Sequence, residues 1–165
     1  NVFANDLPDS DRIGLIEDTS ELRLTAPNHF RFAVQVATPD GLPEVTMTQL
    51  LRACLRQRPD RIIVGEVRGP EAMDAVMAMN TGHPGSMTTI HANNARDALA
   101  RLRTCCAMAK VEIPWRAIGA LISGAIQLVV HIEKQLTGVR VIKEVVEVVR
   151  YRGETDDYEL QEVMR

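Results

Sequence analysis

Two short apolar runs that each lead to a glutamate constrain the fold of this chain most strongly. The first spans residues 12–16 and is followed by Glu17, and the second spans residues 62–64 and reaches Glu66 after one glycine. The second run is apolar on both faces, which is typical of a buried parallel strand rather than of an open antiparallel edge. Because the carboxyl ends of parallel strands line the ligand crevice of open α/β sheets, both glutamates are candidate site residues.

The rest of the pattern alternates strands with helices. Residues 30–36 and 87–90 predict further strands. Helices are predicted after Thr46 or Thr48, from Pro70 to about Asn80, after a capping-box-like Asn94, and from Pro114, with each proline at the first helical position. Residues 128–132 and 139–149 flank a Thr-Gly turn and predict a β-hairpin, with a last strand over 158–164. We therefore expect an α/β fold with a mostly parallel sheet flanked by helices and a C-terminal β-hairpin extension.

Composition narrows the functional classes. The 165 residues are 45% hydrophobic and 25% charged, which is ordinary for one globular domain and excludes a disordered tail or a coiled coil. The net charge of −3 disfavours a nucleic-acid module, since such modules are usually basic. The three cysteines form no C-x-x-C pair, so neither a zinc ribbon nor a disulfide framework is expected, and a reducing compartment is favoured. Cys54 and Cys106 fall on inward helical faces and are expected to be buried.

The two glutamates allow more than one chemistry. A carboxylate at the tip of a buried strand can hold Mg²⁺, or a water of its shell, beside a nucleotide. The alternative for Glu66 is an exposed acid that opens a loop, and its spacing alone does not decide between the two. Together with Glu17 it also fits a paired-carboxylate hydrolase, because the sequence does not give the separation of the two groups.

A loop rich in glycine and histidine surrounds the strand predicted over 87–90. His83 and His91 bracket that strand, and their separation of eight positions fits no short metal-ligand spacing. We expect His91 at the same end as the two glutamates, where an imidazole can contact a terminal phosphate. The alternative is a surface histidine bonded to a loop carbonyl.

Arginines are also expected at this end of the sheet. Arg58 and Arg61 stand just before the second apolar run, and Arg68 follows Glu66 by two residues. Arg68 is thereby placed to orient the carboxylate or to reach a phosphate.

Three segments in order resemble signature boxes of one known family. Residues 16–22, 58–69 and 80–93 resemble the acidic box, the Walker B strand and the histidine box of the type II/type IV secretion ATPases, in particular the tight-adherence pilus and conjugal-transfer ATPases. The resemblance covers roughly residues 10–150. It implies a RecA-like P-loop NTPase core, present here in part. It also implies ATP and Mg²⁺ as ligands, and a homohexameric cytoplasmic motor docked peripherally on an inner-membrane secretion or pilus platform.

The same resemblance assigns roles to seven residues. Glu17 would orient or deprotonate the attacking water, and Glu66 would act on Mg²⁺ through a water. His83 and His91 would sense the γ-phosphate and couple its state to motion. Of these two histidines, His91 is counted with the two glutamates as catalytic. Arg68 would support Glu66, and the remaining nucleotide-binding candidates in these boxes are Asp18 and Thr89.

One element of the family pattern is absent from this sequence. The phosphate-binding loop G-x-x-x-x-G-K-[ST] occurs nowhere in residues 1–165. We therefore expect residues 1–165 to be the C-terminal portion of a RecA-like ATPase domain, with the P-loop and an N-terminal domain upstream. The alternative is a non-catalytic RecA-like module that assembles with, or regulates, a complete secretion ATPase. A DNA-handling RecA-like ATPase is disfavoured by the acidic charge and the histidine box, and the transported substrate does not follow from the sequence.

Overall fold

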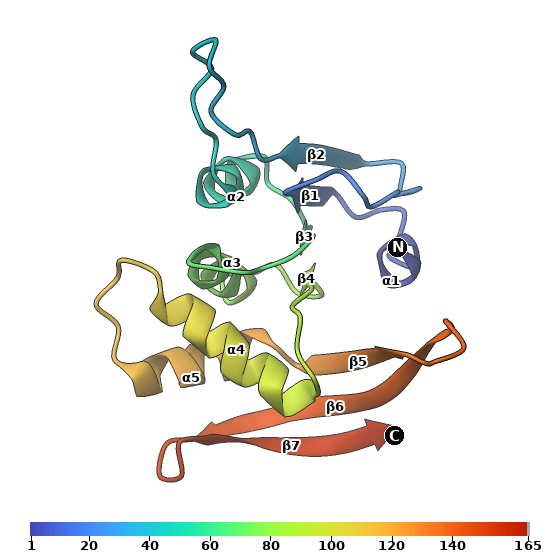
Figure 1. Cartoon of the computed structure of the whole chain (residues 1–165), viewed down its shortest axis with the longest axis vertical. Helices are drawn as coiled ribbons and strands as arrows, with labels where there is room; N and C mark the ends of the chain where they lie inside the picture. Colours follow the sequence, from blue (N-terminus) through green and yellow to red (C-terminus); the bar gives the residue numbers. More distant parts are fainter. Residues whose placement is uncertain (165) are drawn as a thin grey trace.

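The computed structural model describes residues 1–164 and contains two sheets (Figure 1). The first sheet is parallel with strand order β2-β1-β3-β4, and the second is antiparallel with order β5-β6-β7. The strands are β1 (Ile13–Glu17), β2 (His29–Ala33), β3 (Arg61–Val64), β4 (Met87–Thr88), β5 (Leu128–Lys134), β6 (Arg140–Arg152) and β7 (Asp157–Met164). The predicted parallel sheet with a C-terminal antiparallel extension is confirmed.

Capping side chains fix where two of the helices begin. Thr46 Oγ1 accepts a hydrogen bond from Gln49 N while Gln49 Oε1 accepts one from Thr46 N, which is a full capping box. Asn94 Oδ1 accepts from Asp97 N at 2.8 Å. The helices are α1 (Val2–Asn5), α2 (Met47–Arg56), α3 (Glu71–Met79), α4 (Ala95–Ala107) and α5 (Trp115–Ala125). The four predicted helices are present, and α1 was not predicted because four residues are too few to show a helical period.

Both faces of the parallel sheet are covered, which is why every residue of the central strand β1 is buried (Figure 1). Ile16, Ile62 and Val64 belong to the main core, to which each of the helices α2 to α5 also contributes buried residues. On the other face, Ile13 and Ile63 pack in a smaller cluster with Leu15, Ala26 and Ala4 of α1. This two-sided burial holds the carboxyl ends of β1 and β3 side by side.

The cysteines belong to the main core. Cys54 and Cys106 are buried as predicted, and Cys105 is buried with them. Burial raises the pKa of Cys54 to about 11 and that of Cys106 to about 12, so both thiols stay protonated at neutral pH. They therefore behave as apolar side chains.

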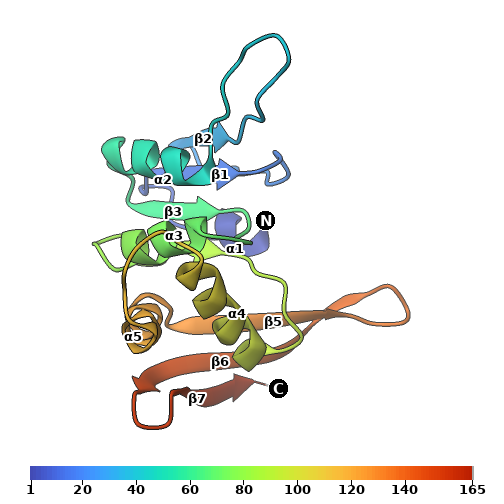
Figure 2. The same cartoon turned by 60° about the vertical axis from the view of Figure 1, so that its left-hand side comes forward.

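A buried arginine ties the second sheet to its helices. Figure 2 shows α4 and α5 lying over one face of β5-β6-β7. Arg103 of α4 is only 4% exposed; it donates to the carbonyl of Trp115 at 2.9 Å, to Tyr151 Oη at 2.9 Å and to Asp156 Oδ1 at 2.6 Å. These contacts join α4, the start of α5, β6 and the β6–β7 turn.

Several element boundaries differ from the prediction. β2 ends at Ala33 rather than at position 36, because the chain then leaves the sheet and Gln35 pairs with Val45 in an isolated bridge. β4 contains two residues instead of four. Pro70 and Pro114 are N-cap residues rather than first helical residues. In residues 1–164 no helix is long and apolar enough to cross a membrane.

Candidate functional site

The two predicted carboxylates meet at the carboxyl edge of the parallel sheet. Ile16 of β1 stands in register with Val64 of β3, and Gly65 N donates to Ile16 O at 2.8 Å. Glu17 therefore ends β1 next to the point where the chain leaves β3 and reaches Glu66. The convergence expected from the two apolar runs is present in the structure.

One carboxylate oxygen of Glu17 accepts two hydrogen bonds, whereas the other is ion-paired with an arginine and accepts none. Its side chain is buried, and Oε1 accepts hydrogen bonds from Glu21 N at 2.9 Å and Leu22 N at 2.8 Å. Oε2 is buried and receives no hydrogen bond from the described residues, although Arg31 Nε lies 3.4 Å away. The Arg31 guanidinium offsets part of the cost of burying this charge, and Oε2 still lacks a hydrogen-bond donor among the described residues, so it can accept one from a ligand or water.

In Glu66, too, one carboxylate oxygen accepts a hydrogen bond and the other accepts none. Arg68 Nη2 donates to Glu66 Oε2 at 2.6 Å, and this hydrogen bond is the main cause that lowers the pKa of the Glu66 carboxyl. The carboxylate is therefore ionised at neutral pH. Oε1 is buried without a hydrogen bond from residues 1–164, and His91 Nε2 lies 3.3 Å from it.

Backbone contacts place Glu66 relative to β4. Thr89 Oγ1 donates to Gly65 O at 2.6 Å, and Val67 N donates to Thr89 O at 3.0 Å. Thr89 thus binds the residues immediately before and after Glu66 in the chain. Asp18 is exposed directly after Glu17, and its charge adds to that of Glu66 in raising the pKa of Arg68.

Six of the seven predicted site residues thus gather at one edge of the sheet. They are Glu17, Asp18, Glu66, Arg68, Thr89 and His91.

An arginine that sequence reasoning did not single out borders this edge. A hollow of about 490 Å³ is lined by His91, Ala92, Asn93, Asp97, Ala100 and Arg101. Arg101 makes no hydrogen bond or ion pair with the residues that the structure describes, and its charge helps to lower the pKa of Glu66. The sequence feature that could have identified Arg101 is its position one helical turn after Asp97, since both residues lie on the exposed face of α4.

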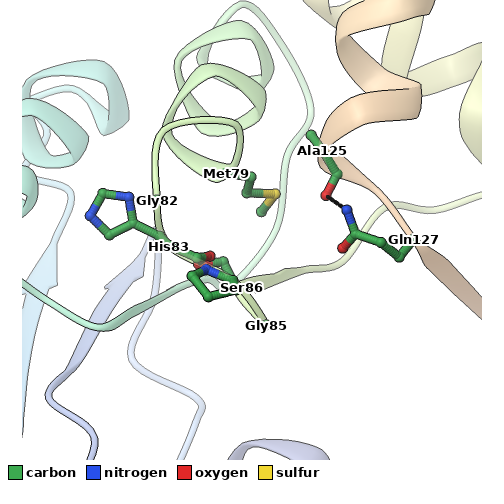
Figure 3. Close-up of a pocket in the computed structure, with 8 residues that line it drawn as sticks. Met79, Gly82, His83, Gly85, Ser86, Ala125 and Gln127 are labelled. Atoms are coloured by element: carbon green, nitrogen blue, oxygen red, sulfur yellow. Dashed lines mark hydrogen bonds between the residues drawn. The ribbon is translucent and has the colours of Figure 1, made fainter.

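His83 lies at the opposite edge. It precedes β4, whereas His91 follows β4, and the two ends of a strand in a parallel sheet lie at opposite edges. Its Nδ1 lies 3.1 Å from Ala78 O, beside a hollow of about 380 Å³ (Figure 3). The residues that line this hollow are Met79, Gly82, His83, Pro84, Gly85, Ser86, Ala125 and Gln127. The expectation that both histidines share one site is not met.

The expected cluster of arginines is corrected in the same way. Arg61 is the first residue of β3; its Nε pairs with Asp11 at 2.5 Å and its Nη1 donates to Pro84 O at 3.2 Å. Arg58 precedes it in the loop after α2. Both arginines therefore lie at the amino edge of the sheet, away from Glu66, and only Arg68 has the predicted position.

The matching family model and two similar proteins all belong to secretion or conjugal-transfer systems. A family model described as "Type II/IV secretion system protein" matches residues 1–153. The conjugal transfer protein TrbB of Rhizobium radiobacter is 43% identical over 143 residues, which cover 87% of this chain and 41% of that protein. The type IV secretion system protein PtlH of Bordetella pertussis is 38% identical over 138 residues, covering 82% and 41%. The chain thus spans 41% of the length of each of these two relatives.

A solved structure extends the likeness to three dimensions. The VirB11 ATPase from the Brucella suis type IV secretion system, in complex with sulphate, matches with a TM-score of 0.75 and 34% identity. The match covers 86% of this chain and 41% of that one, and it confirms the RecA-like α/β fold predicted from the sequence. Since the family model matches almost the whole chain, and relatives more than 30% identical cover most of it, the chain belongs to the type II/IV secretion system protein family.

Proposed function

We propose that this chain is the C-terminal portion of the ATPase domain of a hexameric motor for secretion, pilus assembly or conjugal transfer. In this proposal it contributes the acidic box, Walker B strand and histidine box to ATP hydrolysis. The observation that carries the proposal is the pairing of Glu17 and Glu66 at the carboxyl edge of the sheet. Each acid has one buried carboxylate oxygen without a hydrogen-bond donor among residues 1–164.

These two oxygens, which accept no hydrogen bond from residues 1–164, fit Mg²⁺ and its water shell. Mg²⁺ prefers oxygen ligands and usually keeps several waters, so one or two carboxylates suffice to hold it beside phosphates. Glu66 Oε1 would accept from a water of that shell, while Arg68 keeps the other oxygen of the same carboxylate in place. When bound, Mg²⁺ neutralises charge that develops on the transferred phosphate.

The residues around the two acids then have distinct tasks. Glu17 Oε2 would accept a hydrogen bond from the attacking water and orient it, because Oε1 is fixed by two backbone amides. His91 is exposed beside Glu66 and would contact the terminal phosphate. Thr89 holds the backbone that carries Glu66, and Asp18 lies on the same edge. His83 is not part of this proposal, because it lies at the other edge.

The remaining parts of the nucleotide site would come from the rest of the protein. β4 pairs only with β3, and β5 pairs only with β6, so each has an edge unpaired within the described residues. We propose that the full-length protein supplies the P-loop and the N-terminal domain and covers these edges. A homohexamer in the cytoplasm, docked on an inner-membrane platform, is supported by the relatives described as type IV secretion components.

The test is ATP hydrolysis by the full-length protein. Glu66→Gln is expected to leave nucleotide binding largely intact and to lower turnover by about 10²–10⁴-fold, because disrupted Mg²⁺ positioning should cost as much as the loss of a positioned acid–base group. Glu112→Gln, an exposed acid in the loop before α5, serves as the matched control and is expected to be silent. Turnover of Glu66→Gln within a few-fold of the wild type would refute the assignment.

The second candidate function shares the acidic box, the Walker B strand and the histidine box but not the catalysis. A RecA-like module without catalysis could assemble with, or regulate, a complete secretion ATPase. It would show neither Mg²⁺-dependent ATP binding nor turnover as the full-length protein alone. Titration with labelled ATP therefore separates the two proposals.

A further inference from the structure

Glu71 reaches backward from its helix onto the loop that carries Glu66. It is the first residue of α3, and its Oε1 accepts hydrogen bonds from Arg68 N at 2.7 Å and from Gly69 N at 2.8 Å. A single carboxylate oxygen thus binds two consecutive backbone amides of the loop.

The proline at the N-cap explains this unusual reach. In a capping box, an acid or amide in the first turn accepts from the N-cap amide, but Pro70 has no N–H to donate. The Glu71 carboxylate instead passes over Pro70 to the two preceding amides. A β-carbon on the buried Gly69 would lie 3.1 Å from Glu71 Oε2, so the missing side chain leaves room for the carboxylate.

These contacts connect Glu71 to the proposed catalytic acid. Arg68, whose amide Glu71 holds, is the residue whose guanidinium binds Glu66 at 2.6 Å. Thr89 holds the loop from the side of β4 through Gly65 and Val67. Glu71 therefore fixes the end of the loop that Thr89 does not hold.

We propose that Glu71 is a positioning residue for the proposed ATPase reaction: it fixes the Arg68 backbone so that the guanidinium orients the Glu66 carboxylate. Glu71 acts through Arg68 and does not itself contact the reacting atoms. This inference rests on the proposed function and adds a residue that lies outside the site predicted from the sequence.

The test compares three substitutions of Glu71 in the full-length protein. Glu71→Ala is expected to lower kcat about 10–100-fold, the usual cost of losing a group that orients a ligand-binding side chain, with KM for ATP changed less than about threefold. Glu71→Gln is expected to keep most activity, because its amide oxygen still accepts from both backbone amides. Glu71→Asp keeps the charge but shortens the reach, so it is expected to lose activity like alanine while the fold is retained.

The matched control is Asp74→Asn in the same turn of α3. Asp74 accepts from Thr48 Oγ1 at 3.0 Å and does not contact the loop, so its substitution is expected to leave kcat unchanged. A double-mutant cycle with Arg68→Ala adds a readout that a purely structural cap would not move. If Glu71 acts through Arg68, adding Glu71→Ala to Arg68→Ala is expected to cost little further activity.

The outcomes separate this inference from the function on which it rests. Wild-type kcat in Glu71→Ala and Glu71→Asp, with Glu66→Gln inactive, would overturn the role of Glu71 alone. Effects of Glu71→Ala and Arg68→Ala that simply multiply would also overturn it. Full activity of Glu66→Gln would instead overturn the proposed function itself.

Discussion

The side chain of Glu17 occupies space that Gly65 leaves open on the neighbouring strand end. A β-carbon added to Gly65 would lie 3.2 Å from Cγ of Glu17, closer than ordinary van der Waals contact. Gly65 precedes the catalytic candidate Glu66 in the chain, and it lies against the side chain of the other candidate, Glu17. The two acids are therefore sterically coupled through a single glycine.

We predict that Gly65→Ala lowers ATP turnover of the full-length protein severalfold, less than the about 100-fold that a 1 Å misplacement can cost, because Glu17 has to yield by only a few tenths of an ångström. The added β-carbon presses on Cγ of Glu17, and the two backbone amides that hold Oε1 resist the movement that would relieve the contact. Gly153→Ala is the control, because nothing lies within 4 Å of a β-carbon there. Equal turnover rates of both variants and the wild type would show that Glu17 tolerates the displacement.

His91→Ala is predicted to impair turnover more than folding. The His91 side chain is 79% exposed, and its removal leaves no cavity, so the free energy of unfolding should change by less than ~0.5 kcal/mol. His29→Ala removes an exposed histidine at the start of β2, at the opposite edge, and is expected to leave turnover unchanged. Turnover and Tm measured on both variants decide the matter. A large fall in Tm with normal activity per folded molecule would assign His91 a structural role.

The part of the site that the sequence predicted correctly depends on strand ends. Apolar runs that stop at Glu17 and just before Glu66 identify the carboxyl edge, because burial on both faces of a parallel sheet requires such runs. The same reasoning failed for Arg61 and His83. Arg61 begins β3 and His83 precedes β4, so both lie at the amino edge, and a pattern of residue types near a strand does not say which edge each residue reaches.

Other features depend on contacts between distant segments, which a local pattern does not contain. Arg103 reads as an ordinary arginine on a helix, yet its partners Tyr151 and Asp156 lie 48 and 53 residues away in the sequence. From the sequence, Glu71 is an acid that favours the start of a helix. Only the structure shows that its carboxylate accepts hydrogen bonds from the preceding loop. The fold class was therefore predictable, whereas the side-chain networks that hold the site were not.

The Arg103–Asp156 pair predicts a pH-dependent stability. The hydrogen bond from Arg103, followed by that from Tyr151, lowers the pKa of Asp156 from 3.8 to about 2. A lowered carboxyl pKa stabilises the fold above the unfolded-state value, and this contribution is lost as the pH falls from about 4 through about 2. Asp156→Asn should therefore lower Tm most at neutral pH, and the difference from the wild type should shrink below about pH 4.

Thermal unfolding between about pH 2.5 and pH 7 measures this dependence. Asp40→Asn, an exposed aspartate in the loop after β2, is the control and is expected to leave Tm unchanged at every pH. A Tm difference for Asp156→Asn that is constant with pH would show that the ion pair does not carry the effect.

Residues 1–165 purified alone are predicted not to hydrolyse ATP. Glu17, Glu66 and His91 all belong to one edge of the parallel sheet. Without a P-loop, the phosphates would lack the backbone donors and the lysine that normally bind them, so affinity should be poor. The edges of β4 and β5 that are unpaired in the described residues should also favour aggregation or non-native dimers, which size-exclusion chromatography with light scattering would detect.

Adding the proposed upstream half in the same chain should give Mg²⁺-dependent turnover and a six-fold assembly. The comparison is informative because both proteins contain the same two acids, and the added half is proposed to supply the groups that bind the phosphates and complete the ring. Glu17→Gln provides the control for chemistry at this site, since it removes the charge of Glu17 while keeping its shape. Steady ATP turnover by residues 1–165 alone, abolished by Glu17→Gln, would mean that the nucleotide site is complete within this chain and that the proposed domain boundary is misplaced.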